Sequence, residues 1–223
     1  MNSIATLLAL SCLFLLGSSR MLMSIKMVAF QGFLLAILPL AAGGEHFSMA
    51  LVVLVIASIG LKGILLPWLL NKAMVVSGTR REIEPFISFG ASMLFGIFLL
   101  AVSAWIVNKL QTTESLASPV TLISGFFLVF SGLLLLTTRR KALTQTLGFL
   151  VLENGVYTSG LSLGSEFSVM VELGILLDVF VGIFLMGIML FHIDREFDHL
   201  DADRFNELSD LEFTASEEEE GAE

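Results

Sequence analysis

Cysteine is almost absent from the sequence, because Cys12 is the only one. A single thiol excludes a disulfide framework within the chain, and it also excludes a cysteine-rich metal or iron–sulfur site. His46, His192 and His199 are spread over both expected sides of the molecule, so we expect no shared metal site from them. The sequence contains no Walker loop, no GxGxxG pattern and no HExxH pattern. We therefore predict no catalytic, cofactor-binding or metal-binding residues in this chain.

Charged residues are also scarce. They make up 15% of the 223 residues, whereas a soluble domain carries about 25%. Hydrophobic residues make up 56%, and the mean hydropathy is +0.90. Several apolar runs approach the length of about 20 residues that crosses a hydrocarbon core of ~30 Å. The sequence therefore predicts an all-α, polytopic membrane protein.

The negative charge is concentrated in one place. The formal net charge is −9, but residues 193–223 alone carry 13 acids and 2 bases. We expect these residues to form a solvated, acidic cytoplasmic tail. An alternative is a short amphipathic helix on the membrane surface or on a partner, with Phe197, Leu200, Phe205 and Leu208 on one side.

Seven apolar segments are expected to form transmembrane helices, at residues 2–17, 27–42, 48–70, 86–107, 119–137, 143–163 and 168–192. The first segment could be a signal peptide, because Gly17, Ser18 and Ser19 are small. It has no positively charged start, so a retained first helix is the preferred interpretation. We divide the chain into a four-helix region at 1–110, a three-helix region at 111–192 and the tail at 193–223.

The basic residues indicate how these helices are oriented. With seven helices, ten of the basic residues fall on the side reached after the first segment, and only Lys109 falls on the other side. Because lysine and arginine are enriched in cytoplasmic loops, the N-terminus is expected outside and the C-terminus in the cytoplasm. Lys62 is left out of this comparison because it lies within a segment.

Two acids interrupt the last two apolar segments. Glu153 lies about ten residues, or roughly 15 Å, from either end of segment 143–163. Asp178 lies about as deep in segment 168–192, again roughly 15 Å from the outer end. Adjacent antiparallel helices would bring both carboxylates to the bilayer midplane. Charge at that depth costs several kcal/mol, so it usually marks a functional site such as a proton relay. A structural ion pair, or a hydrogen bond to Asn154, is the alternative.

Two further charged residues accompany this pair. Lys62 is expected some 6 Å to the cytoplasmic side of the acids, within reach of its four-carbon side chain. Its alternative role is to extend its ammonium to the inner membrane surface. Glu172 lies about one turn inside segment 168–192, where a hydrated acid near the membrane surface is the alternative. The expected proton pathway therefore comprises Glu153, Asp178, Lys62, Glu172 and Asn154.

At these residues the chain resembles a known family, component E of hydrogenase-4, a membrane-bound [NiFe] hydrogenase complex. The resemblance rests on three stretches. The first is Thr137–Gly155, with Arg139-Arg140, Gln145, Gly148 and Leu152-Glu153-Asn154-Gly155. The others are Val171-Glu172-Leu173-Gly174 followed by Asp178, and Leu61-Lys62-Gly63-Ile64-Leu65-Leu66-Pro67. The last three segments are similar to the K subunit of complex I and to the C subunit of multisubunit sodium/proton antiporters. Glu153 matches the first buried acid of the K subunit, and Asp178 stands at the second.

This resemblance implies a non-catalytic subunit of a redox-driven proton or sodium pump in the cell inner membrane. It implies antiporter-like membrane subunits and an anchor resembling the complex I H subunit as partners. Iron–sulfur clusters, and a [NiFe] centre where the complex works on hydrogen, would lie in peripheral partner subunits. Nucleic acid is not an expected partner.

Other functions stay open at this point. The chain could be a purely structural scaffold of the same membrane arm, or a subunit of a multisubunit cation/proton antiporter. A self-contained secondary transporter would show inverted repeats, and seven segments do not divide into two such halves. A retinal protein needs a lysine in its last helix, and residues 168–192 contain none.

Overall fold

The part of the chain that the computed structural model describes is helical. It comprises residues 1–41, 55–56, 58–77, 86–111, 118–162, 174 and 176–187. The elements are α1 (Asn2–Gly17), α2 (Met21–Ala41), η1 (Ile59–Leu65), α4 (Leu66–Val76), α5 (Phe89–Gln111), α6 (Pro119–Thr138) and α7 (Ala142–Ser162), followed by a helix at Leu176–Gly187. Since η1 runs directly into α4, each expected segment contains one helical stretch. The all-α class is confirmed.

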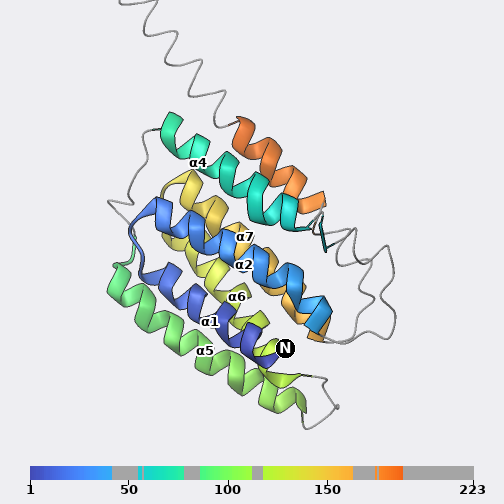
Figure 1. The fold of residues 1–223 in the computed structure, drawn as a ribbon. Coiled ribbons are helices and arrows are strands. Elements are labelled where there is room, and N and C mark those ends of the chain that lie inside the picture. The colour runs from blue at the N-terminus through green and yellow to red at the C-terminus, as the bar shows by residue number, and fades with distance from the viewer. Residues whose placement is uncertain are drawn as a thin grey trace, which may run out of the picture.

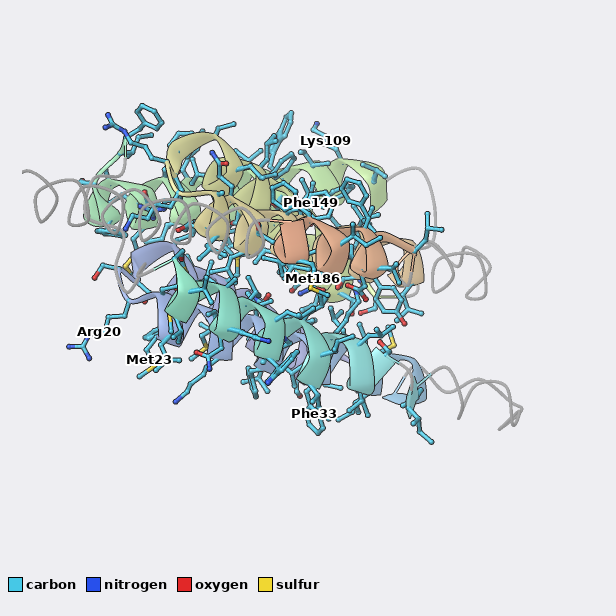
Figure 2. All side chains as sticks on the ribbon, turned by 90° about the horizontal axis from the view of Figure 1, so that it is seen from above. Arg20, Met23, Phe33, Lys109, Phe149 and Met186 are labelled. Carbon is cyan, nitrogen blue, oxygen red and sulfur yellow. The ribbon has the colours of Figure 1, made fainter. Side chains whose placement is uncertain are left out.

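Among the residues that the structure describes, four helices are long and apolar enough to cross a membrane. They lie at Met21–Leu38, Ile59–Val76, Phe89–Leu110 and Pro119–Thr138. α1 and the helix at Leu176–Gly187 are apolar but shorter as described. Large apolar side chains also point outward from the bundle, as Met23 and Phe33 do in Figure 2. These features are those of a membrane protein, because lipid rather than water suits such a surface.

Two boundaries differ from the expectation by six residues, and those of α5 (expected 86–107) differ by three and four. α2 begins at Met21, so Lys26 lies in a helix and the connection from α1 is short. Methionine and leucine favour helix, and one lysine on a helix surface does not end it. α4 continues to Val76, where residue 70 was the expected end. There the Lys72 ammonium lies 5.3 Å from the centroid of the Trp68 ring, which helps to accommodate this charge within the helix.

The helices form one bundle with α6 and α7 at its centre (Figure 1). α6 contacts α1, α5 and α7, and α2 contacts α7, α1 and the η1–α4 stretch. The η1–α4 stretch and the helix at Leu176–Gly187 lie side by side at one edge, whereas α5 lies at the opposite edge. Fully buried leucines fill the interior, among them Leu8, Leu35, Leu122 and Leu147. The bundle therefore joins helices from both regions predicted from the sequence.

Glycines allow α6 and α7 to pack with their backbones in contact. A Cβ atom on Gly155 would lie 2.5 Å from the backbone nitrogen of Val129, and one on Gly148 would lie 2.8 Å from the Leu135 Cβ. Gly155 therefore serves close helix packing. At Gly187 a Cβ would meet nothing within 4 Å in the structure, and at Gly182 it would make an ordinary contact with Leu69. The close approach of α6 fixes the position of α7, the helix that carries Glu153.

Replacing Gly155 by alanine is expected to destabilise the bundle by roughly 1–3 kcal/mol, as overpacking of a tight interior does. The matched control is Gly60→Ala, because a Cβ there would meet nothing within 4 Å. Cys12 is buried and is the only cysteine, so a dye that fluoresces on reaction with thiols reports unfolding. We expect the unfolding temperature measured with this dye to fall for Gly155→Ala only. Equal temperatures for the two variants would contradict backbone contact between α6 and α7.

Candidate functional site: a buried lysine–carboxylate cluster

Lys62 reaches the centre of the bundle from η1, which is a π-helix. π-Helical turns are rare in proteins, and those that do occur are often found at functional sites. On one side, η1 packs closely against α2, because a Cβ atom on Gly32 would lie 2.9 Å from the Lys62 Cβ. Only 11% of the Lys62 side chain is exposed. The close packing on Gly32 anchors the base of the lysine, and its ammonium extends toward α7.

Glu153 and Asp178 meet this ammonium from two other helices. The Lys62 Nζ donates a hydrogen bond of 2.5 Å to the Oε1 of Glu153 on α7. It also lies 3.8 Å from the Oδ2 of Asp178, on the helix at Leu176–Gly187. Both carboxylates are buried, with 4% of the Glu153 side chain and 1% of the Asp178 side chain exposed. We call these three residues the charge cluster.

The charge cluster holds two acids and one base. When both acids are ionised, its net charge is −1. The Oε2 of Glu153 and both carboxylate oxygens of Asp178 accept no hydrogen bond from the described residues. Because an uncompensated charge is costly in an apolar interior, the arrangement favours the uptake of one further positive charge. A proton on one carboxylate would satisfy that demand.

A second polar network lies beside the charge cluster. The Asn154 Nδ2 donates to the Oε1 of Gln31 at 3.3 Å, and the Gln31 Nε2 donates to the Ser11 hydroxyl at 3.0 Å. The Ser11 hydroxyl in turn donates to the backbone carbonyl of Leu8 at 2.7 Å. All three side chains are buried, so these bonds join α7, α2 and α1 through the interior. The network fixes the rotation of α7 and thereby the direction in which Glu153 points.

Two cavities adjoin the cluster. The larger, of about 300 Å³, is lined by Leu152, Glu153, Val156, Tyr157, Gly174, Leu176 and Leu177. The smaller, of about 10 Å³, lies on the Lys62 and Asn154 side and is bounded elsewhere by Val28, Gly32, Leu66, Pro67, Leu70 and Leu150. A volume of that size is at the lower limit for one water molecule. The Tyr157 ring also faces the lysine, with its centroid 5.9 Å from the Nζ.

The residues predicted from the sequence are placed as follows. Glu153, Asp178 and Lys62 are brought together, and the Lys62 ammonium bonds Glu153 instead of extending to a membrane surface. Asn154 is buried but bonds Gln31 and not Glu153. Glu172 lies outside the described residues. Gln31 and Tyr157 were not predicted, although an amide within the apolar run 27–42 was a visible signal for Gln31.

The part of the chain that the structure describes contains no cluster of the side chains that usually bind metal ions. No three of their histidine, cysteine, aspartate and glutamate residues are grouped so that they could hold an ion. The charge cluster has only two such residues, and its third member is a lysine, which as an ammonium cannot ligate a metal. The chemistry available to these residues is therefore proton exchange and ion pairing.

The chain is similar to an uncharacterized protein of Mycobacterium tuberculosis, Rv0085. The two sequences are 30% identical over 187 residues, which cover 83% of this chain and 85% of the mycobacterial protein. No protein-family model matches the chain, and no solved structure matches it.

Proposed function

The chain belongs to the same protein family as Rv0085 of Mycobacterium tuberculosis, and from that premise we propose what such a protein does. We propose that it is an integral membrane subunit of a redox-driven proton or sodium pump related to complex I and to membrane-bound hydrogenase. In this proposal the charge cluster lies on the ion pathway. The chain has no active site of its own, and electron transfer occurs in peripheral iron–sulfur partners.

The observation that carries the proposal is the convergence of three ionisable side chains from three helices. Glu153 and Asp178 are buried, Lys62 has 11% of its side chain exposed, and each lies in a helix that is otherwise largely apolar. Ionisable groups at membrane depth are costly, and in membrane proteins they mark ion and proton pathways. The stretches around Lys62, Glu153 and Asp178 resemble hydrogenase-4 component E, and this resemblance supports the same proposal. The geometry and the sequence pattern support one proposal independently.

The cluster suggests how a proton would move. Lys62 lies against Glu153 at 2.5 Å and near Asp178 at 3.8 Å. A small displacement of its ammonium would exchange one carboxylate partner for the other. The acid that loses the positive charge takes up a proton, and the acid that gains the charge releases one, because a nearby positive charge favours the ionised form. Lys62 would thus couple proton uptake at one carboxylate to proton release at the other.

A scaffold without a transport role is the second candidate. The observation that favours it is the hydrogen-bond network of Asn154, Gln31 and Ser11, which locks three helices together through buried polar groups. Such networks can serve to fix a unique packing. The charge cluster differs from this network, because three of its oxygen atoms accept no hydrogen bond from the described residues. A structural pair would be expected to satisfy them.

The proposal includes a topology of seven membrane-spanning helices with the N-terminus outside and the C-terminus in the cytoplasm. We expect a cysteine placed in residues 193–223 to react with an impermeant thiol reagent only after the cells are opened. Lys109→Cys is the matched control, and it should react in intact cells. Cys12 is buried, so its background reaction should be low. Labelling of the tail from outside intact cells would overturn this topology.

The test of the proposed function is the composition of the complex that contains the chain. We expect the tagged full-length chain, extracted from native membranes in mild detergent, to co-purify with antiporter-like membrane subunits and a peripheral iron–sulfur arm. Mass spectrometry identifies these partners, and a tagged unrelated membrane protein from the same cells is the control. The proposal fails if the chain purifies alone and transports ions by itself in vesicles.

A further inference from the structure

Tyr157 lies beside the charge cluster and has no role in the relay described above. It follows Glu153 by four residues on α7, so the two side chains lie on the same face of that helix. It is also the only tyrosine of the chain. The Lys62 Nζ lies over its ring, 5.9 Å from the centroid. From α7 the lysine therefore meets a carboxylate and, one turn further along, an aromatic face.

An aromatic face attracts an ammonium ion because the electron density of the ring makes the face negative. The attraction operates within about 6 Å of the ring centroid, and it is stronger where both groups are removed from water. Only 11% of the Lys62 side chain is exposed, and the Tyr157 side chain is partly buried. The two residues therefore meet the conditions for a cation–π contact.

The ring attracts the ammonium without adding a charge to the cluster. Two acids already face one base, and a third carboxylate would need a further proton or cation in the apolar interior. An ammonium has three N–H donors, and Glu153 accepts one of them. An aromatic face can attract the same group from another side, and it does not take up a proton. Proton exchange is thereby left to Glu153 and Asp178.

We propose that Tyr157 is a positioning residue of the charge cluster, whose ring face is the third partner of the Lys62 ammonium beside the two carboxylates. The contact holds the ammonium close to α7 and favours the charged form of the lysine. Its role in the relay rests on the proposed function: the ring keeps the ammonium within reach of both acids while it exchanges one carboxylate for the other. The contact itself does not depend on ion transport.

The first test observes the ring directly. Supplying 3-fluorotyrosine during expression labels Tyr157 alone, and its fluorine resonance responds to a charge over the ring. Two variants of the full-length chain are compared, Glu153→Gln and the double variant Lys62→Met with Glu153→Gln, which differ only at residue 62. We expect the resonance to shift between them. Lys72→Met is the control and should match the wild type, because Lys72 lies over Trp68. An identical resonance in the first pair would overturn the contact.

The second test separates the electron density of the ring from its volume. Tyr157 is replaced by 4-ethynylphenylalanine or by 4-cyanophenylalanine, two side chains of nearly the same shape, of which only the second withdraws electrons strongly from the ring. Both lack the phenolic hydroxyl, so a hydrogen bond of that group is lost equally. We expect the cyano variant to unfold about 2–4 °C below the ethynyl variant, because its face attracts the ammonium less. The thiol dye on Cys12 measures both temperatures.

The same comparison is repeated in the background of Lys62→Met with Glu153→Gln, where no ammonium faces the ring. The difference between the two variants should disappear there, because a double-mutant cycle isolates the interaction between residues 62 and 157. A difference of equal size in both backgrounds, or none in the background that keeps Lys62, would refute the positioning role and leave Tyr157 as part of the cavity wall. None of these measurements uses ion transport, so failure of the contact and failure of the proposed function are separate results.

Discussion

Replacing Lys62 by methionine is expected to destabilise the protein by about 3–5 kcal/mol, the usual effect of removing one member of a buried ion pair. Methionine is unbranched and only one atom shorter than lysine, but it leaves Glu153 and Asp178 without a positive charge between them. Both acids are almost fully buried, so bulk water compensates little for the missing partner. The unfolding temperature, followed by reaction of Cys12 with the thiol dye, measures the effect.

Lys72→Met is the matched control for this experiment. Lys72 lies on the same helical stretch, but its side chain is exposed. Its ammonium lies over the face of the Trp68 ring. Its loss should cost less than about 1 kcal/mol. Adding Glu153→Gln to Lys62→Met should restore much of the stability, because the closest unpaired acid is then neutral. If Lys62→Met were as stable as Lys72→Met, the ammonium would not be paired in the interior.

The convergence of Lys62, Glu153 and Asp178 could be predicted from the sequence. A helix rises 1.5 Å per residue, so the position of Glu153 in its apolar run gives its expected level along the helix axis. The same arithmetic placed Lys62 within reach of the acids. The charge cluster combines residues 62, 153 and 178, and the structure joins them over distances of 2.5 and 3.8 Å. Depth is a one-dimensional property, and for that reason one sequence is enough to estimate it.

The choice of partners could not be predicted in the same way. Asn154 follows Glu153 directly, yet it points to α2 and bonds Gln31, because neighbouring residues on a helix are about 100° apart. Which helix lies on which side of α7 depends on packing, and here it depends on glycine contacts between α6 and α7. A π-helix at Lys62 likewise shifts the angular position of that residue relative to a regular helix. Rotation and neighbourhood are set by three-dimensional contacts that a hydropathy pattern does not contain.

If the chain is the proposed subunit of a redox-driven pump, replacing Glu153 by glutamine is expected to separate electron transfer from ion translocation. Glutamine keeps the volume of glutamate, and its Oε1 can still accept the hydrogen bond from Lys62. It has no proton to exchange, so assembly should survive while the number of protons moved per electron pair falls severalfold. Asp178→Asn should act alike, because Asp178 is the other carboxylate near the Lys62 ammonium. The measurement is proton translocation per electron pair in reconstituted complexes, taken together with the rate of electron transfer.

The double variant tests whether the two acids act in one relay. If protons pass from one carboxylate to the other, either single change already breaks the path, and the combined loss must be less than the sum of the two. Independent paths would give additive losses. Lys62→Arg adds a further test, because it keeps a positive charge but replaces the compact ammonium by a wider planar group that cannot exchange partners over so short a distance. We expect it to assemble and to pump poorly. An unchanged ratio of protons to electrons in both single variants and in the double variant would reject the relay and leave the charge cluster as a structural element of the helix bundle.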